Sequence, residues 1–304
     1  MRKLGSLLFY VLLATLLVAL AAGCSKGCGK GGANGERLAV SVSIFPVYDL
    51  VRRVAGPDAD VALLLPAGQS EHAYEPTPKD IEAAAKVKVA IMVGLGLDPW
   101  METLMKSAAS NARIVKVGDR VPTLTIKDDP KADEDGAIDP HFWLDPERAR
   151  LVVRAIAEEL GKADSAHAIA YRQRATELDA SLAALDKEVE TRTKALTTRG
   201  FVTLHGGFQY FAERYKLEVL AVIETVPGAQ PAAPHVAKVL EVIKAKKVPA
   251  LFTEPQLDPG PAKALAGEAK LPLGVLDAVG GGPEADSYER MIRFDVAQLE
   301  KHLK

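Results

Sequence analysis

Residues 145–196 read DPERARLVVRAIAEELGKADSAHAIAYRQRATELDASLAALDKEVETRTKAL. Ala, Leu, Glu, Arg and Lys dominate this run, and all five are strong helix formers. Asp145 followed by Pro146 is typical of a helix start, because aspartate caps the first turn and proline fits the first helical position. Gly161 marks a break in the first third of the run, and the remainder predicts one long linking helix over residues 166–198.

On either side of this helix, short apolar runs alternate with helical patterns. Before it, the sequence predicts strands at Leu38–Ile44, Val61–Leu65, Val87–Val93 and Arg113–Val117. After it, the predicted strands are Phe201–Leu204, Glu218–Ile223, Pro249–Thr253 and Leu273–Leu276. Strands that alternate with helices are typical of a parallel sheet with helices on both faces. We therefore expect an α/β fold with two parallel-sheet lobes, at residues 37–165 and 199–304, joined by the linking helix.

The N-terminal residues differ in character from the rest of the chain. Arg2 and Lys3 precede an apolar run over residues 7–22, which is the plan of a secretory signal peptide. The run is shorter than the ~20 residues that a membrane-spanning helix needs, which argues against a transmembrane anchor. We expect a signal peptide at residues 1–23 and therefore an exported protein.

The end of this signal resembles the lipobox of bacterial lipoproteins. Ala-Gly precedes Cys24, although Ala21 stands where a larger aliphatic residue is usual. The resemblance implies that Cys24 is lipidated, and the Gly-, Lys- and Ser-rich residues 24–36 then form a flexible tether. We expect a soluble domain held to a membrane in the periplasm or at the cell surface.

Composition argues against a nucleic-acid-binding protein and against a domain stabilised by cysteines. The net charge is −2 and no long basic stripe is present, so the chain lacks the electrostatic footprint of a nucleic-acid partner. Cys24 and Cys28 are the only cysteines, and both precede the predicted domain. Neither a disulfide nor a cysteine metal site is therefore expected to stabilise the domain.

Several potential metal ligands follow predicted strands. His72 lies in the loop after Val61–Leu65, His205 comes directly after Phe201–Leu204, and Asp277 comes directly after Leu273–Leu276. In open parallel sheets, ligands bind outside the carboxyl ends of the strands. We expect these three side chains to converge in a cleft between the two lobes.

His141 completes the predicted ligand set. It lies between Asp139-Pro140 and Asp145-Pro146, and proline restricts both itself and the residue before it, so this loop should be stiff. Three imidazole nitrogens and one carboxylate suit tetrahedral Zn²⁺, whereas Mn²⁺ prefers more oxygen ligands. Carboxylates that could orient an imidazole or replace a ligand are Glu254, Asp139 and Glu71.

Five motifs resemble the solute-binding lipoproteins of bacterial zinc and manganese ABC importers. They are HAYEPTP at residues 72–78, DPHFWLDP at 139–146, LHGGFQYF at 204–211, FTEPQ at 252–256, and Leu276-Asp277 followed by Gly280. The resemblance implies His72, His141, His205 and Asp277 as metal ligands, and a permease with its ATPase as the membrane partner. It also implies a metal held between two lobes that a single long helix bridges.

The chain departs from this family's pattern in two places. The loop at residues 127–138 is acidic and has no histidine, whereas zinc-specific members often carry a His-rich loop there. Gly206 and Gly207 follow His205, where an acidic residue and an alanine are common.

The sequence favours metal capture and delivery, most readily of Zn²⁺, over catalysis. Manganese uptake is one alternative. An exported zinc-dependent hydrolase is another, but the chain has neither a His-Glu-x-x-His helix nor a Gly-x-Ser-x-Gly turn. A surface adhesin with incidental histidines is the third.

Overall fold

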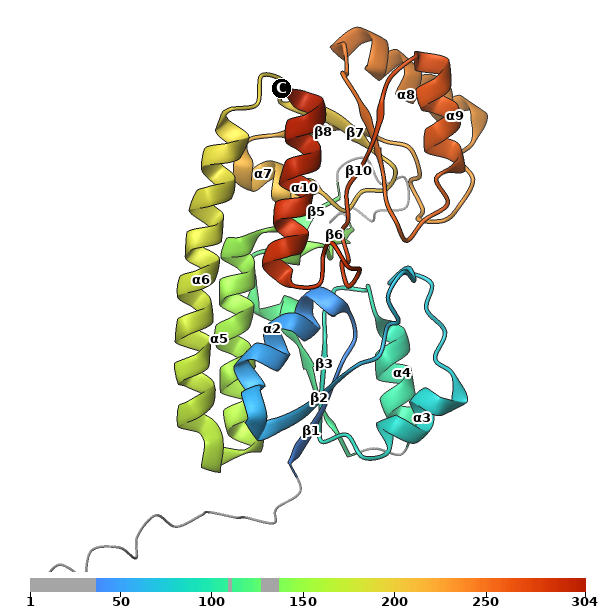
Figure 1. Ribbon diagram of the computed structural model, residues 1–304. Helices are drawn as coiled ribbons and strands as arrows, with labels where there is room; N and C mark the ends of the chain where they lie inside the picture. Colours follow the sequence, from blue (N-terminus) through green and yellow to red (C-terminus); the bar gives the residue numbers. More distant parts are fainter. Residues whose placement is uncertain (1–36, 109–110, 127–136) are drawn as a thin grey trace, which may run out of the picture. The chain divides into compact units, whose positions relative to one another are not determined.

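A four-stranded parallel sheet forms the first lobe of the computed structural model, which describes residues 37–108, 111–126 and 137–304 (Figure 1). The strands are β1 (Leu38–Val42), β2 (Ala59–Leu63), β3 (Val89–Met92) and β4 (Arg113–Lys116), in the order β2-β1-β3-β4. The predicted signal peptide, Cys24, the tether and most of the acidic loop lie outside the described residues. Among the residues that are described, none of the helices is both long and apolar enough to cross a membrane.

Alternate residues of these strands pack against helices on opposite faces. Val89 and Ile91 of β3 join the main core with α2 (Phe45–Ala55), whereas Ala90 and Met92 pack in a second cluster. That second cluster contains side chains of α3 (Pro78–Ala84) and α4 (Pro99–Ser107). Because successive side chains of a strand point to opposite faces, both faces of the sheet are covered.

A second four-stranded parallel sheet forms the other lobe. Its strands are β7 (Gly200–Thr203), β8 (Glu218–Val222), β9 (Leu251–Thr253) and β10 (Leu273–Val275), in the order β10-β9-β7-β8. Its helices are α7 (Gln209–Tyr215), α8 (Ala233–Lys246), α9 (Gly260–Ala269) and α10 (Tyr288–Leu303). Val202 and Leu251 face α8 and α9, whereas Phe201 and Phe252 face the main core. The two sheets confirm the predicted α/β fold with two parallel-sheet lobes.

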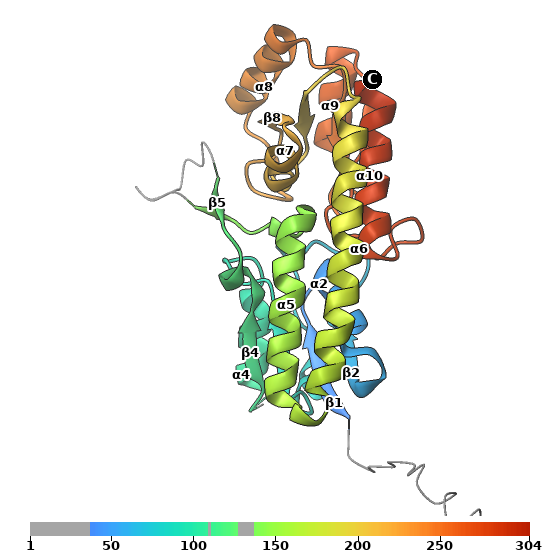
Figure 2. The same ribbon diagram turned by 90° about the vertical axis from the view of Figure 1, so that its left-hand side faces the viewer.

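The central sequence run forms two helices that lie side by side (Figures 1 and 2). They are α5 (Pro146–Ala163), which Asp145 caps by accepting from the Glu147 N–H, and α6 (Ala168–Lys194). The break falls at residues 164–167 and not at Gly161, which lies within α5. A Cβ at Gly161 would lie 3.1 Å from the Ala168 Cβ, so this glycine allows the close approach of α5 and α6.

The helix α6 and the main core extend through both lobes. Helix α6 contacts α2 of the first lobe and α7 and α10 of the second. The indole N–H of Trp143 donates to the carbonyl of Ala278 at 2.7 Å, and the Tyr288 hydroxyl donates to the carbonyl of Trp143 at 2.6 Å. The lobes therefore share buried hydrogen bonds close to the residues predicted to bind metal.

A small antiparallel sheet, which the sequence did not predict, pairs β5 (Leu124–Thr125) with β6 (Ile138–Asp139). Tyr210 of α7 joins this pair by accepting from the Leu124 N–H at 2.9 Å and donating to the carbonyl of Asp139 at 2.7 Å. These bonds fix the backbone two residues before His141.

Candidate metal centre

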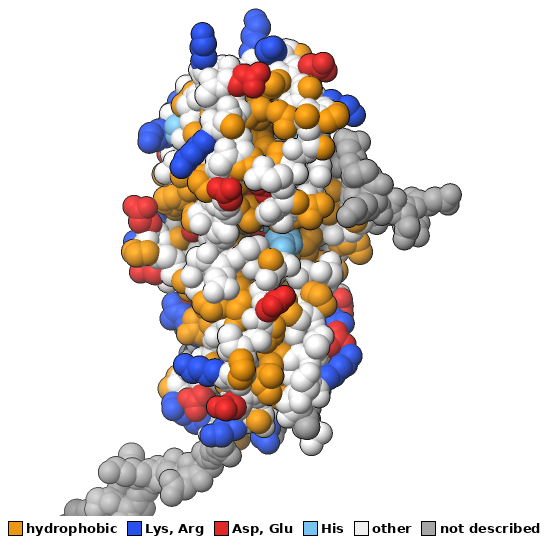
Figure 3. Space-filling model, turned by 90° about the vertical axis from the view of Figure 1, so that its right-hand side faces the viewer, with side chains coloured by type: hydrophobic (Ala, Val, Ile, Leu, Met, Phe, Trp, Pro, Cys, Tyr) orange, Lys and Arg blue, Asp and Glu red, His pale blue; other side chains and the backbone are white. Residues whose placement is uncertain are grey.

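His72 lies on the loop that runs from β2 to α3. Two residues further on, the Tyr74 ring packs edge-on against Trp100, with ring centroids 4.8 Å apart. The Tyr74 hydroxyl donates at 2.8 Å to Asp80, which also caps the start of α3. The loop is thus anchored beside His72, whose side chain is 23% exposed. Histidine surface is visible at mid-height on the face shown in Figure 3.

His141 is held by the carboxylate of Asp139. Asp139 Oδ1 lies 2.8 Å from His141 Nδ1 and accepts the His141 backbone N–H at 2.9 Å. The Trp143 ring packs against the imidazole with centroids 5.1 Å apart, and both side chains are buried. The short helix η3 (Phe142–Leu144) follows at once, so the imidazole is fixed by its hydrogen bonds, by packing and by the backbone.

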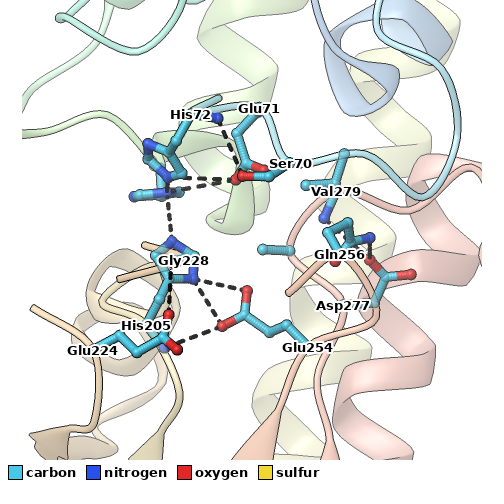
Figure 4. A network of polar contacts seen from close by, with 12 residues as sticks. Ser70, Glu71, His72, His205, Glu224, Gly228, Glu254, Gln256, Asp277 and Val279 are labelled. Atoms are coloured by element: carbon cyan, nitrogen blue, oxygen red, sulfur yellow. Dashed lines mark hydrogen bonds and ion pairs between the residues drawn. The ribbon is translucent and has the colours of Figure 1, made fainter. Parts of the chain in front are cut away.

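In the second lobe, a carboxylate holds His205 as Asp139 holds His141. Its Nδ1 lies 2.7 and 2.8 Å from the two carboxylate oxygens of Glu254, which directly follows β9 (Figure 4). Burial alone would lower the pKa of His205, but the Glu254 carboxylate, helped by Glu71 and Asp139, outweighs it and raises the pKa to about 9. In the metal-free protein His205 is therefore protonated at neutral pH.

The three imidazoles converge through their Nε2 atoms. The distance from His141 Nε2 to His205 Nε2 is 3.1 Å, and from His141 Nε2 to His72 Nε2 it is 3.3 Å. A carboxylate only accepts hydrogen bonds, so His141 and His205 each present an Nδ1–H to their carboxylate and direct Nε2 at one another. The two Nε2 atoms lie within hydrogen-bond distance of each other.

These distances suit a small tetrahedral ion. Bonds of about 2.0–2.1 Å in a tetrahedron place ligand atoms roughly 3.3–3.4 Å apart. Burial, followed by the charges of His141 and His205, lowers the pKa of His72 to about 2, so its imidazole is neutral and able to coordinate. The donor set fits a divalent transition metal.

Glu71 adds a carboxylate to this group. Its Oε1 lies 3.6 Å from His72 Nε2 and 3.9 Å from His141 Nε2, and it has no hydrogen-bond partner among the described residues. Glu71 is 2% exposed, and burial raises its pKa. One donor atom from each of Glu71 and the three histidines lies within 4.8 Å of all the others. A buried carboxylate oxygen that faces imidazoles and has no hydrogen-bond partner is well placed to bind a metal ion as a ligand.

Asp277, the fourth ligand expected from the sequence, stands apart from this group (Figure 4). Its Oδ1 accepts from Gln256 Nε2 at 2.7 Å and from the backbone N–H groups of Gly280 and Val279 at 2.8 and 3.2 Å. Its own backbone N–H donates to Asp295 at 2.7 Å. The structure thus brings together His72, His141 and His205 with Glu71, whereas turn contacts hold Asp277.

Glu224, which lies beside His205, is not among the residues that the sequence pattern predicts for the site (Figure 4). Glu224 is 3% exposed and accepts the Gly228 N–H at 2.8 Å. Burial raises its pKa, and the His205 charge opposes that effect. It comes just after β8, so the rule that identified ligands at the carboxyl ends of strands could have found it.

A family model described as "ZnuA: Zinc-uptake complex component A periplasmic" matches residues 40–302. The chain is 28% identical over 301 residues to the high-affinity zinc uptake system protein ZnuA of Brucella abortus (strain 2308), covering 85% of this chain and 90% of that protein.

Two other proteins resemble this chain over most of their length. The chain is 26% identical over 283 residues to the manganese ABC transporter substrate-binding lipoprotein PsaA of Streptococcus mitis, covering 89% and 91% of the two chains. The crystal structure of a Zn(II)-bound AdcAII variant of Streptococcus pneumoniae superposes with a TM-score of 0.79 at 26% identity, covering 89% of this chain and all of that one.

Loss of the Asp139 carboxylate should weaken metal binding without removing a ligand. In Asp139→Ala, His141 keeps its ring but loses the acceptor that fixes its tautomer, so zinc affinity should fall about 10–100-fold. Competition titration against a chromogenic chelator measures this change. Glu82→Ala, which removes an exposed carboxylate of α3, is the control and should bind zinc like the unmodified protein. Equal affinity in both variants would contradict the orienting role of Asp139.

Proposed function

The chain belongs to the family of periplasmic zinc-uptake components, and on that premise we propose that it is the solute-binding component of an ABC importer. It captures a divalent transition metal outside the cytoplasm, most favourably Zn²⁺, and delivers it to a membrane permease coupled to an ATPase. One observation carries this proposal: three Nε2 atoms, two of them oriented by buried carboxylates, converge at distances of 3.1 and 3.3 Å.

We propose His72, His141, His205 and Glu71 as the four ligands. Glu71 is preferred to Asp277 because its Oε1 faces the imidazoles and lacks a hydrogen-bond partner among the described residues, whereas Asp277 Oδ1 accepts three hydrogen bonds. Three nitrogens and one oxygen favour Zn²⁺ over Mn²⁺. Manganese remains the second candidate because one of the similar proteins is named for it.

The proposed ligand set supports binding over catalysis. Four protein ligands complete a tetrahedral zinc site, so no position is left for a reactive water. An exported zinc-dependent hydrolase would instead need an open position on the ion. Turnover of ester or peptide substrates by the zinc-loaded protein would contradict the binding role.

The proposed location follows from the N-terminal residues. We propose that residues 1–23 direct export, that Cys24 carries a lipid and that residues 24–36 tether the domain to a membrane. The two lobes, residues 37–165 and 199–304, would then present the metal close to the permease, with residues 166–198 between them.

Zinc affinity should fall as the pH falls, because a proton occupies His205 in the metal-free protein. The pKa of His205 is raised to about 9, so between pH 7.5 and 5 zinc must displace that proton, and the affinity should fall about tenfold for each pH unit. Zinc titrations at the two pH values measure the slope. In His205→Ala zinc should bind more weakly at pH 7.5 and with a shallower slope. Equal affinity at both pH values would contradict histidine ligation.

Two isosteric variants identify the carboxylate ligand. Glu71→Gln should lower zinc affinity by about tenfold or more, because an amide oxygen replaces an anionic donor on the ion. Asp277→Asn keeps an oxygen acceptor for its turn contacts and should change affinity less. Calorimetric titration of both variants at pH 7.5 makes the comparison. A larger loss in Asp277→Asn would assign the fourth ligand to Asp277.

A further inference from the structure

Glu224 lies one strand away from His205, just past the carboxyl end of β8. Its backbone N–H donates at 2.7 Å to the carbonyl of Leu204, the residue that precedes His205. This bond continues the parallel pairing of β7 with β8 and brings the Glu224 side chain beside the imidazole (Figure 4). The same sheet therefore positions both His205 and this carboxylate.

Among the described residues, no lysine or arginine forms an ion pair with the buried Glu224 carboxylate. Glu224 is 3% exposed, and its Oε2 accepts a hydrogen bond from the neutral Gly228 N–H at 2.8 Å. Of the charged groups that act on it, His205 attracts the carboxylate, whereas Asp258 and Glu254 repel it. Because a buried charge is costly unless an opposite charge compensates it, this carboxylate favours positive charge at or beside His205.

Glu224 is not one of the proposed ligands. The donor atoms that lie within 4.8 Å of one another belong to Glu71 and the three histidines, and Glu224 is outside this group. Nor does it orient a ligand, since the carboxylate that faces His205 Nδ1 is that of Glu254. Glu224 can therefore act on a bound ion only through its charge.

From this placement we infer that Glu224 is a specificity-determining residue, which favours divalent over monovalent ions without touching them; the inference rests on the proposed function. The attraction between two charges is proportional to each charge, and salt screens buried charges much less than exposed ones. A doubly charged ion beside His205 therefore gains more from Glu224 than a singly charged ion does. Imidazole suits both zinc and copper, so the ligands alone separate ions of different charge less sharply.

Three variants separate the charge of Glu224 from its structural contact. Glu224→Gln removes the charge but keeps an oxygen that can accept the Gly228 N–H. Glu224→Asp keeps the charge on a shorter side chain. Asp258→Asn is the matched control, because Asp258 likewise accepts a glycine N–H, that of Gly260 at 2.9 Å. Asp258 is exposed, however, so solvent and salt screen its charge.

The test measures the affinities for Zn²⁺, Co²⁺ and Ag⁺ by competition titration in nitrate buffer at pH 7.5. Glu224→Gln should lower the Zn²⁺ and Co²⁺ affinities by the same factor, roughly three- to tenfold. The Ag⁺ affinity should fall by no more than the square root of that factor, because Ag⁺ carries half the charge. The visible absorption bands of the Co²⁺ complex should stay unchanged, since no ligand is altered. Glu224→Asp and Asp258→Asn should retain the unmodified ratio of Zn²⁺ to Ag⁺ affinity.

The outcomes separate a charge effect from a structural one. An equal loss of Zn²⁺ and Ag⁺ affinity, or a changed Co²⁺ spectrum, in Glu224→Gln would overturn the inference, as would unchanged affinity for all three ions. If Glu224→Gln does not fold, Glu224→Asp decides: a retained ratio of Zn²⁺ to Ag⁺ affinity supports the charge effect, and a lower ratio overturns it. Failure of the unmodified protein to bind zinc would instead overturn the proposed function.

Discussion

The site depends on two buried hydrogen bonds, one from each lobe, in which an imidazole Nδ1–H faces a carboxylate. Asp139 holds His141 in this way and Glu254 holds His205, at 2.8 and 2.7 Å. Each bond leaves the Nε2 lone pair free on the opposite side of the ring, and the fold turns these two atoms to within 3.1 Å of each other. Two lone pairs at that distance need a cation between them. Because the pKa of His205 is raised to about 9, a metal ion must displace a proton from His205 at neutral pH, which makes binding sensitive to pH.

The fold brings the two bonds together through its sheets and its shared core. His205, Glu254 and Glu224 all follow strands of the second sheet, where the carboxyl ends of parallel strands meet. His141 belongs to the first lobe and is fixed by the β5–β6 pair and by Trp143, which is hydrogen-bonded to Ala278. A core that continues through both lobes holds these residues in place before the metal binds. Binding therefore requires little further ordering of the protein.

Much of this arrangement could be predicted from the sequence, because it follows from strand periodicity and strand ends. Both sheets, the long helix and the placement of His205 beside a strand end are local consequences of the residue pattern. The identity of the carboxylate that faces the imidazoles could not be predicted in this way. Glu71 adjoins His72 in the sequence and Asp277 follows a strand end, so the residue pattern alone does not choose between them. Contacts in the folded chain decide it: Gly280 and Gln256 hold Asp277, while Glu71 Oε1 has no hydrogen-bond partner among the described residues. The β5–β6 pair and the role of Gly161 likewise depend on tertiary contacts that no short window of sequence contains.

Anomalous X-ray diffraction from crystals of the protein with one equivalent of zinc, recorded above and below the zinc absorption edge, would locate the ion and identify its ligands. A single strong peak is expected at about 2.0–2.2 Å from the Nε2 atoms of His72, His141 and His205 and from an oxygen of Glu71. A peak elsewhere on the protein, or an ion bound by fewer than two of these imidazoles, would contradict this ligand assignment.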